Sequence, residues 1–152
     1  MTTSPAAVAA ATSPSPTPFP VRVRRATAAW GAARIALGVV AITAPPVVSR
    51  PWIGRDVQTT GGTVFAKALG VRDIALGAGT TAAAFTGKGL SAWALASAAA
   101  DVGDTLITRH HWPDLPRTRV GIAALAGASA LTGVALAAAH ALTSRQFQPR
   151  SH

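Results

Sequence analysis

Residues 64–85 read VFAKALGVRDIALGAGTTAAAF, an apolar run rich in Ala and Gly that also contains Lys67, Arg72 and Asp73. Its length matches the roughly 20 residues that an α-helix needs to cross the hydrocarbon layer of a membrane. Three similar runs lie at about 27–44, 90–108 and 120–142. The sequence therefore predicts an all-α fold, a bundle of four transmembrane helices spanning residues 27–142, with an antiparallel hairpin formed by the second and third helices.

The composition favours a membrane protein over a soluble helical bundle, without excluding the latter. Only 12% of the 152 residues are charged and 49% are hydrophobic, and the mean hydropathy is +0.35. A soluble domain usually carries about 25% charged residues. Glu, which soluble helices use on their exposed faces, is absent from the chain.

The two ends of the chain differ from the apolar runs. Residues 1–26 are rich in Pro, Ser and Ala, and repeated prolines interrupt a helix, so we expect a disordered tail that ends in a basic cluster. That cluster consists of Arg22, Arg24 and Arg25, and it favours cytoplasmic termini for a multi-pass protein of the cell membrane. Residues 143–152 form a short polar tail.

Aromatic residues lie near the ends of the apolar runs or between them. Trp30 and Trp93 are close to the starts of two runs, whereas Trp52 and Trp112 fall in expected loops. Tryptophan prefers the membrane interface because its ring is apolar and its N–H needs a polar partner. The pattern supports the four predicted spans.

Six ionisable residues interrupt the apolar runs, three positive and three negative: Arg34, Lys67, Arg72, Asp73, Asp101 and Asp104. A charge at the centre of a bilayer costs about 2.5–3.5 kcal/mol on insertion scales. Lys67 lies near a helix end and is able to reach the interface. The other five are expected to pair with one another or to face an internal polar cavity, as a structural network or as a path for an ion, proton or small molecule.

Glycines accompany the charges at helical spacing. Gly31 and Gly38 share a face with Arg34, and Gly70 and Gly77 share a face with Asp73. Small residues allow membrane helices to approach closely, so these four glycines are predicted packing positions. The octets GAARIALG (31–38) and GVRDIALG (70–77) match at five of eight positions, with Arg34 corresponding to Asp73. This match indicates either an internal repeat or chance similarity between Ala/Gly-rich runs.

No motif of an enzyme, cofactor site or metal site is present. The chain has no Cys, no Gly-rich phosphate loop and no nucleophile elbow, and His110-His111 is read as part of an exposed linker. The net charge of +9 lies in tails and loops, a distribution that fits anionic lipid rather than nucleic acid.

The pattern resembles an uncharacterised family of small four-helix bacterial membrane proteins, a domain of unknown function. The similar segments are WGAARIALG (30–38), WIGRD (52–56), ALGVRDIALG (68–77) and ADVGD (100–104), within about residues 27–110. Their G-x-R-D-x-x-L-G core followed by D-x-x-D is the most specific part. The resemblance implies a membrane location and a four-helix fold, and it brings no activity, cofactor or catalytic residue.

Two functional hypotheses follow from the sequence. The first is a structural or accessory membrane protein with a buried Arg/Asp network, acting as a homo-oligomer or with a membrane-protein partner. The second is a small transporter or proton-coupled carrier that uses the intramembrane charges. A membrane-bound enzyme of unknown type is a further alternative, but no enzyme motif supports it and an enzymatic role is not predicted.

Overall fold

The computed structural model describes residues 18–146, and within this range the chain forms helices and no strand. The prediction of an all-α fold is confirmed. Five α-helices and two short 3₁₀ turns follow one another along the chain: α1 (Pro18–Thr43), α2 (Pro45–Ile53), η1 (Gly54–Gln58), α3 (Thr60–Thr86), α4 (Leu90–His110), η2 (Trp112–Asp114) and α5 (Arg119–Gln146).

Helix α1 begins earlier than the sequence predicted. Pro18 and Pro20 occupy its first turn, where backbone N–H groups have no intrahelical acceptor and proline is tolerated. The expectation of a disordered tail is therefore wrong for residues 18–26, and residues 1–17 lie outside the described part of the chain. At the other end, α5 extends through residues 143–146, which were expected to belong to the polar tail.

The segment between the first two predicted spans contains a helix rather than a loop. Pro45 and Pro46 end the run of α1 and also start α2, because proline at the first helical positions fits the required backbone angles. Trp52 in α2 is buried, and its Nε1 donates a hydrogen bond to Oγ1 of Thr108 at 2.9 Å. The indole also meets the Phe65 ring edge-on, with 5.5 Å between centroids. The prediction that Trp52 lies in a loop is wrong.

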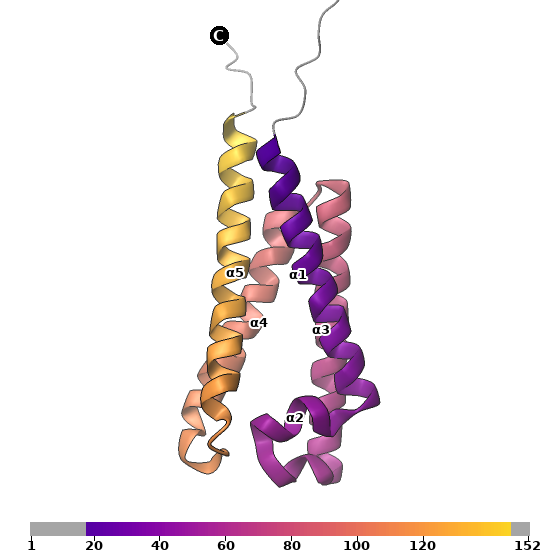
Figure 1. The fold of residues 1–152 in the computed structure, drawn as a ribbon, viewed down its shortest axis with the longest axis vertical. Helices are drawn as coiled ribbons and strands as arrows, with labels where there is room; N and C mark the ends of the chain where they lie inside the picture. Colours follow the sequence, from indigo (N-terminus) through magenta and orange to yellow (C-terminus); the bar gives the residue numbers. More distant parts are fainter. Residues whose placement is uncertain (1–17, 147–152) are drawn as a thin grey trace, which may run out of the picture.

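The long helices form two antiparallel pairs, α1 with α3 and α4 with α5 (Figure 1). In the first pair, Gly31 lies against Gly77 and Gly38 lies against Gly70. A Cβ atom at Gly38 would be 2.5 Å from the Gly70 carbonyl oxygen, and a Cβ atom at Gly77 would be 2.5 Å from that of Gly31. The four glycines therefore bring the two backbones into direct contact, as small residues do in membrane helix pairs.

The matching octets of α1 and α3 lie across this contact in opposite directions. Ile35 packs on Gly77, and the corresponding Ile74 packs on Gly38, so each contact has an equivalent on the other side. The pair has the symmetry of a local two-fold axis through its centre. Arg34 and Asp73, which occupy corresponding positions in the octets, meet near that axis.

The second pair also packs through small residues. A Cβ atom at Gly133 of α5 would be 2.9 Å from the Ala94 carbonyl oxygen and 3.0 Å from the Ala98 Cβ of α4. Gly87 and Gly89, with φ of 72° and 69°, make the tight turn between α3 and α4. The two helices diverge below that turn, and α4 packs chiefly on α5 rather than on α3, in contrast to the expected hairpin (Figure 1).

Within residues 18–146, two helices are long and apolar enough to cross a membrane, through Val21–Thr43 of α1 and Arg119–Thr143 of α5. The beginning of α1 and the end of α5 lie at the same end of the bundle (Figure 1). Helices α3 and α4 have 27 and 21 residues, but their charged side chains lower their hydropathy.

Candidate functional site: an ion network beside an apolar cavity

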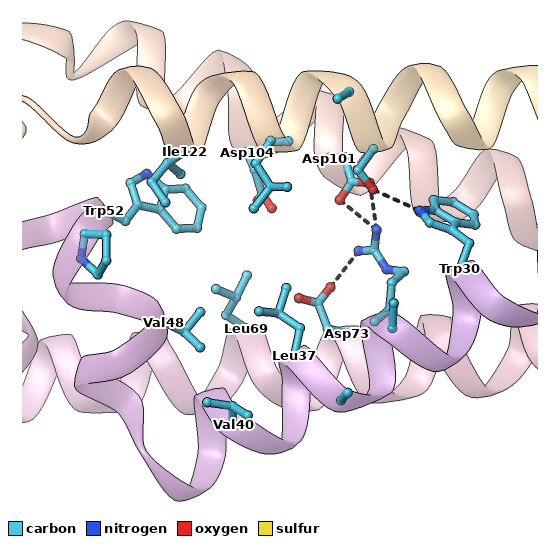
Figure 2. Close-up of a pocket in the computed structure, with 18 of the residues that line it drawn as sticks. Trp30, Leu37, Val40, Val48, Trp52, Leu69, Asp73, Asp101, Asp104 and Ile122 are labelled. Atoms are coloured by element: carbon cyan, nitrogen blue, oxygen red, sulfur yellow. Dashed lines mark hydrogen bonds and ion pairs between the residues drawn. The ribbon is translucent and has the colours of Figure 1, made fainter.

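Arg34 lies at the centre of a set of ion pairs that joins three helices. Its Nη2 donates to Oδ1 of Asp73 at 2.6 Å, and its Nη1 donates to both carboxylate oxygens of Asp101, at 2.8 and 2.7 Å. Only 6% of Arg34 is exposed, and Asp73 and Asp101 are buried as well (Figure 2). Charge-assisted bonds of this kind are about twice as strong as neutral ones, so α1, α3 and α4 are linked through one guanidinium group.

Arg72 and Asp104 extend the network. The two Nη atoms of Arg72 donate to the two carboxylate oxygens of Asp104 at 2.8 and 2.6 Å, a bidentate pair between α3 and α4. Nη2 of Arg72 also lies 3.5 Å from Oδ1 of Asp73. The structure thus brings all five residues of the predicted network together, and each lies near the middle of its helix.

The network carries one excess negative charge. It contains three carboxylates and two guanidinium groups, whereas the neutral set predicted from the sequence also counted Lys67. The Lys67 side chain is exposed on α3 and lies outside the network. Buried ion pairs offset their desolvation cost only when the geometry is good, and an excess buried charge is costly unless something compensates it.

Trp30, one turn before Arg34 on α1, contacts the guanidinium group of Arg34. The guanidinium carbon lies 5.6 Å from the centroid of the indole, within the range of a cation–π contact. Nε1 of Trp30 donates to Oγ of Ser129 on α5 at 3.2 Å. Trp30 therefore lies halfway along α1 and faces the other helices, so the prediction that it marks a helix end is wrong. Its spacing of four residues from Arg34 was the sequence signal for this contact.

Polar contacts join the two helix pairs elsewhere as well. Oγ1 of Thr80 and Oγ of Ser97 lie 3.3 Å apart between α3 and α4, and both residues are fully buried. The Trp52–Thr108 bond adds a link between α2 and α4. Hydrogen bonds and ion pairs therefore link one helix pair to the other, in addition to the Arg34–Asp73 ion pair within the first pair.

A cavity of about 780 Å³ adjoins the network between α1 and α2 on one side and α5 on the other. Figure 2 shows Trp30, Asp101 and Asp73 towards one end of it and Trp52 and Ile122 towards the other. Most of its walls are apolar. The residues that line it are Trp30, Ala33, Arg34, Ala36, Leu37, Val40, Val47, Val48, Pro51, Trp52, Leu69, Asp73, Asp101, Asp104, Ile122, Leu125, Ala126, Ala128, Ser129 and Thr132.

Arg24 of the predicted basic cluster also has a structural role. Its guanidinium donates to the carbonyl oxygen of Ala84 at 2.7 Å and to that of Phe85. These oxygens lie in the last turn of α3, where a positive side chain satisfies carbonyl groups that have no intrahelical donor. Arg22 and Arg25 are exposed and remain available to the surroundings.

No family model, curated protein or solved structure matches this chain. The resemblance to small four-helix bacterial membrane proteins therefore stays a prediction. Within the described residues, no group of three or more His, Asp or Glu side chains is arranged to hold a metal ion.

Proposed function

We propose that the chain is an integral membrane protein with four spans, α1, α3, α4 and α5, and that it has a structural or accessory role based on its buried ion network. The observation that carries the proposal is the distribution of side chains between inside and outside. The buried hydrophobic residues are mostly alanines, and Arg34, Asp73 and Asp101 are buried with them. Many of the large apolar side chains are exposed, although a few, such as Trp52 and Leu90, are buried.

Each of the four long helices carries such an exposed side chain. Val39 of α1, Val71 of α3, Leu106 of α4 and Leu131 of α5 are 45%, 60%, 63% and 73% exposed. Soluble monomers rarely show large contiguous apolar patches, whereas lipid-facing helices require an apolar outer surface. The arrangement on α3 and α4 supports spans at these helices too, because Asp73, Asp101 and Asp104 are directed into the bundle while residues such as Val71 and Leu106 are exposed.

Cysteine labelling tests the number of spans. The chain has no Cys, so Lys88→Cys in the α3–α4 turn and Arg55→Cys and Arg117→Cys at the opposite end each give a single thiol. Four spans place residue 88 on one side of the membrane and residues 55 and 117 on the other. If only α1 and α5 crossed the membrane, all three thiols would react from the same side. Extraction of the protein by carbonate would refute membrane integration itself.

A carrier role is the second candidate, and the cavity is the observation that favours it. Ionisable residues at mid-helix often line the routes of ions and small molecules in membrane proteins. Transporters commonly hold their substrates near the middle of the membrane, and Asp101 and Asp104 lie near the middle of α4 and line the cavity. Flux across vesicles that contain the purified protein, compared with Asp101→Asn/Asp104→Asn, tests this role.

A further inference from the structure

The cavity has the dimensions and lining of a small-molecule site. Ligand pockets usually measure about 300–1,000 Å³ and combine apolar walls with a few polar groups at fixed positions. The volume of about 780 Å³ lies within this range. Side chains such as Leu37, Val48 and Leu69 form the walls, and two indoles, Trp30 and Trp52, lie at its two ends (Figure 2).

The charged groups beside the cavity determine which sign of charge a ligand in it should carry. Asp73, Asp101 and Asp104 line it, but Arg34 is the one basic residue among the lining side chains. Arg72 compensates Asp104 from outside the lining. Counting both arginines, one negative charge remains without a partner charge in the network. A monovalent cation would neutralise it, whereas an anion would add to the excess.

Two carboxylates are placed to receive that cation. Both guanidinium contacts of Asp73 fall on its Oδ1 atom, and Figure 2 shows its carboxylate at the edge of the open space. The Asp104 side chain is 15% exposed, more than that of Asp73 at 5% or Asp101 at 7%.

We infer that this cavity binds an amphipathic organic cation, with its positive group near Asp73 and Asp104 and its apolar body along the wall towards Trp52. The inference depends on the cavity and the charge of the network, not on the number of spans or on transport. A lipid acyl chain or a segment of a second copy would fill the apolar space without using the excess charge. Binding of these alternative occupants would therefore not depend on the charge of the network, whereas binding of a cation would.

Two probes of nearly the same shape and opposite charge test the inference. Binding of tetraphenylphosphonium and tetraphenylborate to the full-length protein in a non-ionic detergent is measured by equilibrium dialysis. We expect saturable binding of the cation and at least tenfold weaker binding of the anion. Equal binding of both probes, or no saturable binding of the cation, would overturn the inference while leaving the carbonate and cysteine-labelling results unaffected.

Three variants show whether the binding is at this cavity. Asp104→Asn removes one lining charge, and we expect the affinity for the cation to fall at least tenfold. Asp114→Asn, in the exposed turn η2, is the matched control and should bind as the unmodified protein does. Ala126→Phe fills the cavity without touching the network, so it should abolish binding even if Asp104→Asn impairs folding. Unchanged binding by Ala126→Phe would place the site elsewhere and refute the inference.

Discussion

At the scale of the residue, Arg34 is the side chain on which the network depends. Replacing it with Met leaves Asp73 and Asp101 buried without their main partner, and removing one member of a buried ion pair usually costs about 3–5 kcal/mol. We expect Arg34→Met to lower the free energy of unfolding by this amount, as measured by denaturant titration in mixed micelles.

Lys67→Met is the matched control for this change. It also removes one positive charge from a long helix, but the Lys67 side chain is exposed and outside the network, so we expect an effect within about 0.5 kcal/mol. Similar losses of stability in the two variants would mean that the ion pairs of Arg34 contribute nothing beyond the general effect of charge removal.

The sequence identified the members of the network but not its connections. The five charges within apolar runs were expected to face inward, because a membrane helix that exposes them to lipid is costly. Which carboxylate each arginine contacts depends on how the helices are arranged, and the apolar runs do not specify that arrangement. Lys67 was included in the neutral set of six charges because the sequence does not give the rotation of α3. Only the structure shows that the Lys67 side chain points outward.

At the scale of the element, the α1–α3 contact depends on glycines that leave no room for a side chain. A Cβ atom at Gly38 would lie 2.5 Å from the carbonyl oxygen of Gly70, so the backbones must move apart. We expect Gly38→Ala to destabilise the protein by about 1–3 kcal/mol, the usual cost of overpacking a well-packed interface, as measured by the same unfolding titration.

Gly127→Ala in α5 is the control that separates the cost of a Cβ atom at the close contact from the difference in helix propensity between Gly and Ala. A Cβ atom there meets nothing within 4 Å, and alanine is favoured over glycine in a helix by about 1 kcal/mol. This control should therefore be neutral or stabilising. A Gly38→Ala variant as stable as Gly127→Ala would contradict the close contact between α1 and α3.

Helix existence was easier to predict than helix extent. The apolar runs located the four long helices, because the length and composition of each run are enough to predict a helix. The prolines of the tail led to a wrong start for α1, because Pro18 occupies the first position of that helix, where its missing N–H costs nothing. Pro45 does follow the end of α1, but it also begins α2, which the sequence did not predict.

At the scale of the whole molecule, the two helix pairs behave as two units that share a polar boundary. Gly and Ala make close contacts within each pair, and Arg34–Asp73 adds an ion pair within the first. Between the pairs lie the ion pairs of Asp101 and Asp104 and hydrogen bonds such as Thr80–Ser97. The cavity lies at the same boundary. The pairing of the helices was not predictable, because the Ala-rich faces of the four helices are too alike to specify their partners. A cavity beside the charges was one of the expected arrangements, but its largely apolar lining was not predicted.

Neutralising the acids of α4 should therefore loosen one pair from the other. Thr80→Cys with Ser97→Cys provides a reporter, since the two native hydroxyl oxygens lie 3.3 Å apart across the boundary. We expect Asp101→Asn/Asp104→Asn to reduce the yield of disulfide between these cysteines at least twofold under mild oxidation, because Asn accepts hydrogen bonds from arginine without the charge attraction. The Asp114→Asn change, in the exposed η2 turn, should leave the yield unaltered. An undiminished yield in the double Asn variant would show that apolar contacts alone hold the pairs together. The role of the ion network would then lie in binding the proposed ligand of the cavity rather than in the assembly of the helices.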